Sequence, residues 1–275
     1  MKDNLIFWKK KLNKNGSKKK TFVILAIFFI FAVCLAVTGF YMKKLSEQKQ
    51  AAEVERQKII KTKESITTFY RKAFAGIDLN QLPIVLNEIE NSRLPFDMIG
   101  FSETEYHCSN ESCRFIYELN DFFVFSVIDK IFFNTKYEGN FTENTLNFDN
   151  VIIKSGKPRF LSKTKKGNQE NTNKCSTLLN YLYGYNSVVD KSDRVKVAKL
   201  PFSSVTVAEQ QFPDYNESYG LMTGEFEVHI GNSFSDAYLF SERNPYKDFF
   251  IVHSIEKSVK TGTDVLLKGV FLCKK

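Results

Sequence analysis

The longest apolar stretch of the chain runs from Thr21 to Met42 (TFVILAIFFIFAVCLAVTGFYM) and contains no charged residue. A helix rises about 1.5 Å per residue and a bilayer core is about 30 Å thick, so about 20 apolar residues suffice to cross it. A cleaved signal peptide has a shorter apolar region that ends at a small-residue cleavage site. A buried core helix normally has a polar face, which this run lacks. The pattern therefore predicts one retained transmembrane helix, since no later apolar run approaches this length.

Lysines on both sides of the apolar run predict its orientation. Residues 1–20 carry eight lysines and one acid, a net charge of +7, whereas residues 43–63 carry a net charge of +4. The more positive flank stays in the cytoplasm, so we expect the N-terminus inside. The bias toward Lys, Asn, Ile and Phe is typical of AT-rich bacterial genomes. The sequence thus predicts a bacterial inner-membrane protein with a cytoplasmic N-terminus and a periplasmic C-terminal part.

The net charge of +8 does not indicate nucleic-acid binding. Once the two basic segments are set aside, the rest of the chain has a net charge of −3. A basic patch on the folded part would be needed to attract DNA or RNA. We expect the basic N-terminal tail to lie near anionic lipid head groups instead.

The stretch from Lys43 to Phe74 has no Gly or Pro and is rich in good helix formers. One set of apolar residues recurs every seven positions, as at one seam position of a coiled coil: Leu45, Ala52, Ile59, Ile66 and Ala73. The other seam position is mostly polar, and its apolar member is Phe69. This half-seam predicts a helix that pairs weakly with a second copy, or pairs with a better-patterned helix of another inner-membrane subunit. The alternative is a solvated stalk.

Beyond Gly76, which can end that helix, Asp78 is placed to cap a second helix through about Ile89. From Phe101 onward the chain changes to short alternating or aromatic-rich runs, which are typical of strands. These runs are 105–107, 114–119, 122–128, 151–154, 195–198, 205–208, 225–230, 237–240, 249–255 and 265–272. Cys175 to Tyr185 is predicted to be a helix, and residues 155–174 a polar loop.

The predicted fold class is α+β, with antiparallel strands. The predicted organisation has four parts: a basic cytoplasmic tail at 1–20, a transmembrane helix at 21–42, a periplasmic helix or weak coiled coil at 43–75, and a periplasmic domain at 76–275. The domain is either one unit or two small units that divide near residues 155–174.

Cysteine usage agrees with an oxidising compartment. Cys34 lies within the apolar run, which leaves Cys108, Cys113, Cys175 and Cys273. Cys108 and Cys113 flank a polar turn between two strand-like runs and could bond to each other, which leaves Cys175 and Cys273 as a second pair by elimination. The alternative for the first pair is a zinc site with His107, since imidazole and thiolate bind zinc. That site would need a fourth ligand and a reducing environment.

The motifs that usually accompany catalysis are not found. There is no glycine-rich phosphate loop, no G-x-S-x-G and no H-E-x-x-H. The three histidines are His107, His229 and His253, and the last two lie in strand-like runs. We therefore predict no catalytic, cofactor or metal site. A membrane-tethered cell-envelope enzyme is kept as an alternative, and it would need a deep pocket with clustered carboxylates or histidines.

The basic tail, single span, following helix and α+β domain resemble the PilO-like inner-membrane alignment proteins of type IV pilus and type II secretion machines. The resemblance is closer to accessory subunits of type IVb pili, including those of toxin-coregulated type. It rests on this plan, on the Cys108-to-Cys113 hairpin and on the terminal run Val265 to Leu272. It implies a non-enzymatic scaffold that binds sister subunits through coiled coils and ferredoxin-like domains. A conjugation or type IV secretion subunit, with a sheet wrapped around long helices, is the runner-up.

Overall fold

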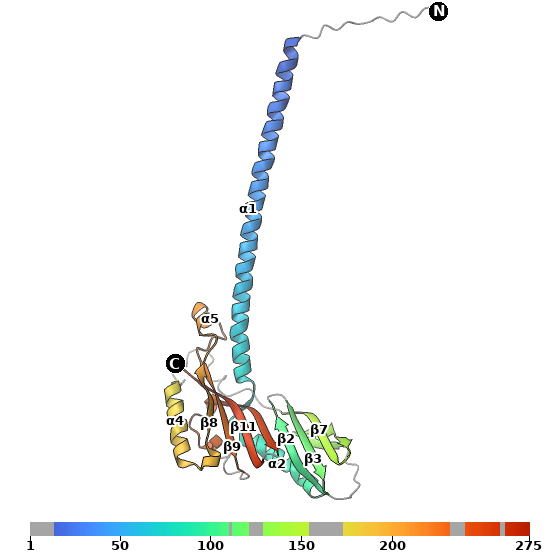
Figure 1. Cartoon of the computed structure of the whole chain (residues 1–275), viewed down its shortest axis with the longest axis vertical. Coiled ribbons are helices and arrows are strands. Elements are labelled where there is room, and N and C mark those ends of the chain that lie inside the picture. The colour runs from blue at the N-terminus through green and yellow to red at the C-terminus, as the bar shows by residue number, and fades with distance from the viewer. Residues whose placement is uncertain (1–13, 110–111, 121–128, 154–172, 232–239, 259–261) are drawn as a thin grey trace, which may run out of the picture. The chain divides into compact units, whose positions relative to one another are not determined.

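The computed structural model describes residues 14–109, 112–120, 129–153, 173–231, 240–258 and 262–275 (Figure 1). The chain divides into two compact units, Met1–Lys61 and Thr62–Lys275. Several predicted segments lie outside the described residues: part of the basic tail, the strand-like run 122–128, nearly all of the loop at 155–174 and most of the run 237–240.

The helix α1 (Lys14–Phe74) contains the apolar run. The large apolar side chains between Ile27 and Met42 are 45% to 73% exposed, and none of the most apolar stretch is buried inside the protein. Within the described residues this is the one helix long and apolar enough to cross a membrane. An apolar helix without a protein partner fits a lipid environment, where every backbone group is bonded within the helix. The structure therefore fits a single-pass membrane protein.

The helix α1 ends at Phe74, just before Gly76, as predicted. A side chain at Gly76 would place its Cβ only 2.4 Å from the carbonyl oxygen of Val252. Only glycine permits this close approach. The chain then enters the short strand β1 (Ile77–Asp78), which pairs with β10 (Phe250–Ser258).

The second helix differs from its prediction. The helix α2 runs from Leu82 to Asp97, with a proline in its first turn and Pro95 near its end. Asp78 does not cap it. Instead, Asp78 Oδ1 accepts a hydrogen bond of 2.8 Å from the backbone N–H of Asn80, which shapes the turn before the helix. The capping prediction was wrong because this local turn takes up the aspartate.

Most of the predicted strands are confirmed, and they form one main sheet. Its other members are β2 (Phe101–Cys108), β3 (Ser112–Leu119), β6 (Asn140–Thr142), β7 (Thr145–Ile152), β8 (Lys196–Phe202), β9 (Met222–Ile230) and β11 (Gly262–Cys273). The order is β6-β7-β3-β2-β10-β11-β9-β8, and β4 (Asp129–Phe132) and β5 (Thr135–Glu138) form a separate hairpin. Strands from before and after the predicted loop share this sheet, so residues 62–275 form one unit.

The ferredoxin-like arrangement is not present among the described strands. In a ferredoxin-like sheet two β-α-β units interleave, so that the two strands joined by each helix have another strand between them. Among the described strands, β8 and β9 are joined through the helix at Thr206–Gln211 but pair directly with each other. The strands β1 and β2, which flank α2, pair with the same edge of β10, because β11 occupies its other edge. The periodicity of the sequence predicted the strands but carried no information on their order in the sheet. The coarser prediction, an α+β domain with an antiparallel sheet, is confirmed.

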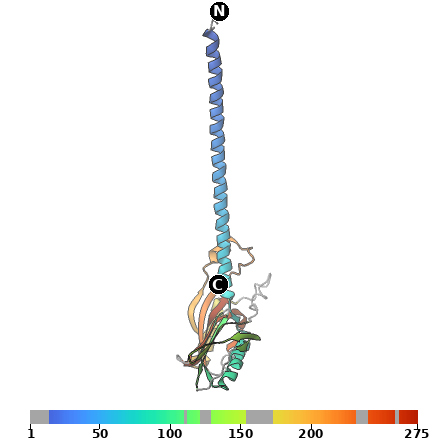
Figure 2. The ribbon, with the colours of Figure 1, turned by 90° about the vertical axis from the view of Figure 1, so that its right-hand side faces the viewer.

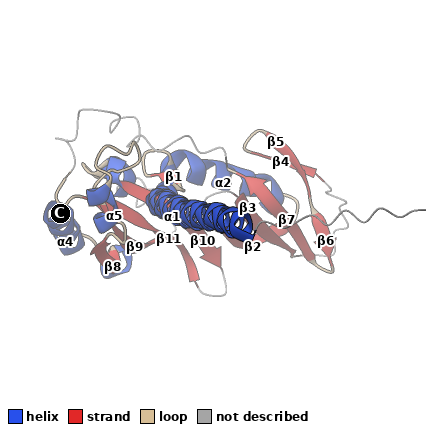
Figure 3. Cartoon of the chain, turned by 90° about the horizontal axis from the view of Figure 1, so that it is seen from above, coloured by secondary structure: helices blue, strands red, loops and turns tan. Residues whose placement is uncertain are grey.

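Both faces of the sheet are covered near its centre. Along β11, Phe271 and Cys273 belong to the main core, whereas Val270 and Leu272 belong to a second cluster. Alternate residues of a strand point to opposite faces, which explains why this run is buried almost continuously. The helix α2 covers the main-core face (Figure 2), and α4 (Cys175–Val188) lies toward the β8–β9 end of the sheet (Figure 3). The last turns of α1 cover the opposite face, which we call the outer face.

One predicted strand is a helix. Residues 205–208 were expected to be extended because Val205, Thr206 and Val207 are β-branched. They instead begin α5 (Thr206–Gln211). Ser203 accepts a hydrogen bond from the backbone N–H of Val205 through its hydroxyl, and Thr206 bonds back to the carbonyl of Ser203. This local turn starts a helix whose later residues, Ala-Glu-Gln-Gln, are good helix formers.

Candidate partner-binding site

The structure separates the six predicted seam residues into two groups. Leu45, Ala52 and Ile59 have exposed side chains, with Leu45 36% and Ile59 38% exposed. Ile66 and Ala73 are 0% and 5% exposed, and Phe69 is half-buried. The last part of the seven-residue series therefore serves the core of the second unit. Only the part from Leu45 to Ile59 is open to a partner helix.

The buried end of α1 forms its own hydrophobic cluster, separate from the main core. Ile66, Tyr70, Ala73 and Phe74 supply the helix side of this cluster. The remaining buried members are Val205, Leu221, Ile251, Val270 and Leu272. We call these nine residues the junction cluster. Burying a large apolar side chain contributes roughly 1.5–3 kcal/mol, so the junction cluster fixes the last turns of α1 firmly on the sheet.

A buried polar network lies within this junction. The Tyr70 hydroxyl donates a hydrogen bond of 2.7 Å to Glu209 Oε1 and accepts one of 3.0 Å from the backbone N–H of Leu221. Glu209 Oε1 also accepts a bond of 2.9 Å from the N–H of Gly220. Burial raises the pKa of Tyr70, and Glu209 adds to the rise, so the hydroxyl stays protonated as a donor. Each polar group therefore has the partner that its burial requires.

Three further contacts join α1 to the segment after α5. Thr67 Oγ1 and the Tyr215 hydroxyl lie 2.8 Å apart in a hydrogen bond. The Lys63 ammonium lies 5.3 Å from the centre of the Phe212 ring and 5.4 Å from that of Tyr215. Such cation–π contacts at exposed sites contribute about 0.5–1 kcal/mol. The segment from Val205 to Leu221 thus holds the last three turns of α1 on one side.

On its other side, α1 borders a groove of about 450 Å³ on the outer face. Phe69 and Lys72 of α1 line it, together with Lys199, Lys268 and His253 from three strands. His253 Nε2 lies 3.3 Å from the carbonyl oxygen of Ala73. Burial lowers the pKa of His253, so the neutral ring with its proton on Nε2 fits this contact.

Ion pairs between neighbouring strands balance the charges of the outer face. Lys196 pairs with Glu227 at 3.0 Å, and Lys199 pairs with Glu225 at 3.3 Å. On β10, Glu256 accepts a bond of 2.8 Å from Lys268. The groove therefore does not bring together unpaired carboxylates in the way that acid–base catalysis requires.

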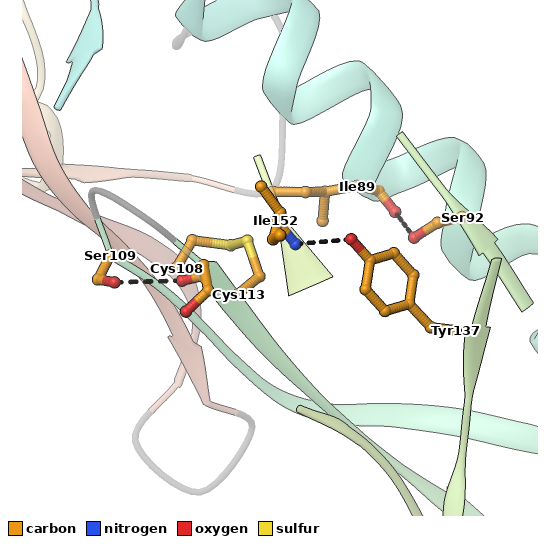
Figure 4. The surroundings of a disulfide bond; sticks show 8 residues. Ile89, Ser92, Cys108, Ser109, Cys113, Tyr137 and Ile152 are labelled. Carbon is orange, nitrogen blue, oxygen red and sulfur yellow. Dashed lines mark hydrogen bonds between the residues drawn. A yellow bond between two sulfur atoms is a disulfide. The ribbon is translucent and has the colours of Figure 1, made fainter. Parts of the chain in front are cut away.

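Both predicted disulfides are present, Cys108–Cys113 and Cys175–Cys273. The first joins β2 and β3 where they pair directly, and the hydroxyl of Ser109 bonds the carbonyl of Ser112 at 3.2 Å across the same turn (Figure 4). Because both sulfurs are bonded to each other, neither offers the thiolate that the zinc alternative needs. Nearby, Tyr137 accepts a hydrogen bond of 2.9 Å from the backbone N–H of Ile152.

The remaining candidate histidines are dispersed. His107 Nδ1 lies 3.7 Å from Glu256 on the outer face, and His229 is exposed on β9. Within the described part of the chain, no group of three or more His, Cys, Asp or Glu side chains is arranged to hold a metal ion.

A buried ion pair on the main-core face was not predicted. Glu103 of β2 and Lys257 of β10 are 3.2 Å apart, with side-chain exposures of 2% and 15%. Burial raises the pKa of Glu103, and the nearby Lys257 opposes that rise. The sequence signal for such a pair is a charged residue at an inward position of an alternating strand, which both residues satisfy.

Sequence reasoning also missed Tyr70 and Glu209. The signal available for Tyr70 was its position next to the seven-residue series, on a helix predicted to be either a weak coiled coil or a solvated stalk. Glu209 gave no signal, because a glutamate directly after a short strand-like run is ordinarily exposed. No known protein family, curated protein or solved structure matches this chain.

Proposed function

We propose that this protein is a non-enzymatic scaffold of a bacterial inner-membrane assembly machine, anchored by one span with its N-terminus in the cytoplasm and its domain in the periplasm. The observation that carries the proposal is α1 itself. One helix contains the apolar run, then exposed apolar residues at seven-residue spacing, and finally residues buried in the core of the domain. Such a helix is suited to binding a partner beside the membrane.

The partners proposed are inner-membrane subunits of a type IV pilus or type II secretion machine. This part of the proposal follows from the resemblance of the chain's overall plan, and of its disulfide hairpin, to the inner-membrane proteins of those machines. The observed strand order removes the argument from a ferredoxin-like domain, so a conjugation or type IV secretion subunit stays as the second candidate. The captured partners decide between these two.

A membrane-tethered enzyme is the alternative from another class. It requires converging acid–base groups in a deep pocket. The groove beside α1 instead carries Glu225 and Glu227, each paired with a lysine of β8, and one histidine bonded to a helix carbonyl. The geometry favours binding over catalysis.

A matched pair of variants tests the proposal. Leu45→Gln, Ala52→Gln and Ile59→Gln together remove the exposed seam, whereas Val54→Gln and Ile60→Gln remove apolar residues from other faces of α1 that are even more exposed, at 69% and 43%. After crosslinking in membranes, purification of the tagged full chain should recover pilus or secretion subunits from the wild type and the control, but at least tenfold less from the seam variant. Equal recovery from both variants would contradict binding through this helix.

A further inference from the structure

We draw no further inference here: the strongest candidate, the side-chain cluster at the turn after β1, where the Asn80 amide donates to both Asp78 and Asp248, carries nothing, because these bonds lie within the cluster and the described residues place no third carboxylate, histidine or cysteine there to hold a metal ion.

Discussion

Tyr70, near the end of α1, donates a buried hydrogen bond of 2.7 Å to Glu209 of α5, 139 residues later in the chain. The two residues tie the last turns of α1 to the segment that precedes β9. Because Tyr70 is 2% exposed and Glu209 8% exposed, water cannot readily replace either partner. This bond is the polar part of an otherwise apolar junction.

Tyr70→Phe should lower the free energy of unfolding by about 1–3 kcal/mol, because it leaves the buried Glu209 carboxylate and the Leu221 N–H each short of a partner. Denaturant unfolding of the full chain in detergent, followed by near-ultraviolet circular dichroism, measures the change. Tyr219→Phe is the matched control, since the Tyr219 ring packs on Tyr70 at 4.9 Å between centroids. Equal effects of the two variants would show that the hydrogen bonds contribute little.

The contact of His253 with the carbonyl of Ala73 predicts a pH dependence. Burial lowers the pKa of His253, and Glu225 only partly opposes this. The unfolded chain therefore binds a proton more readily than the folded chain, and stability falls as the pH drops below the usual histidine pKa of about 6.5. His253→Gln keeps a donor near Ala73 and should flatten the unfolding free energy between pH 6.5 and lower values, relative to the wild type. An unchanged slope would contradict this assignment.

The buried pair of Glu103 and Lys257 should couple strongly. Removing one partner, by Glu103→Gln or Lys257→Met, leaves a poorly solvated group and should cost about 3–5 kcal/mol. The double variant should cost less than either single one, because no charge is left buried. Additive losses in a double-mutant cycle, measured by denaturant unfolding, would argue against direct coupling.

The ionisation of Glu103 in this pair also predicts that the free energy of unfolding depends on pH. Burial raises the pKa of Glu103, so the folded state holds its proton more tightly than the unfolded state. The stability that this proton provides is complete below the usual glutamate pKa and is lost as the pH rises through the raised value. Glu103→Gln should remove this loss from a pH series of unfolding free energies.

The two disulfides should stabilise the domain unequally. They close segments with sequence separations of 98 and 5 residues. On the chain-entropy account, replacing Cys175 and Cys273 by serine should cost up to about 4–5 kcal/mol, and replacing Cys108 and Cys113 about 2 kcal/mol. Unfolding of both double variants under oxidising conditions gives the comparison. A larger loss for the short bridge would contradict the chain-entropy account.

Local patterns predicted the strands well where burial was regular. The runs at 225–230, 249–255 and 265–272 are strands because β-branched and aromatic residues suit a sheet that is covered on both faces. The same preference gave a wrong strand prediction at residues 205–208. There the side chains of Ser203 and Thr206 form a turn that starts α5. Strand direction and order come from pairing between distant segments, which periodicity does not encode.

The exposed part of α1 also shows what periodicity alone cannot predict. Ile59 and Ile66 are equivalent members of the seven-residue series, yet Ile59 is 38% exposed and Ile66 is fully buried. The difference arises because Val205, Leu221 and the sheet fold back on the end of α1. A heptad pattern states that a helix face is apolar, but only the fold shows whether the same chain or a partner covers it.

The measurement that tests the central claim most directly is photo-crosslinking at successive positions from Gln48 to Phe69 in intact membranes, with mass spectrometry of the captured proteins. We predict capture of pilus or secretion subunits, strongest beside Ala52 and Ile59 in a seven-residue rhythm, and a sharp fall after Lys61, where the core of the domain covers the helix. Capture of lipid or of the chain itself at irregular spacing would contradict the account and reduce this part of α1 to a stalk.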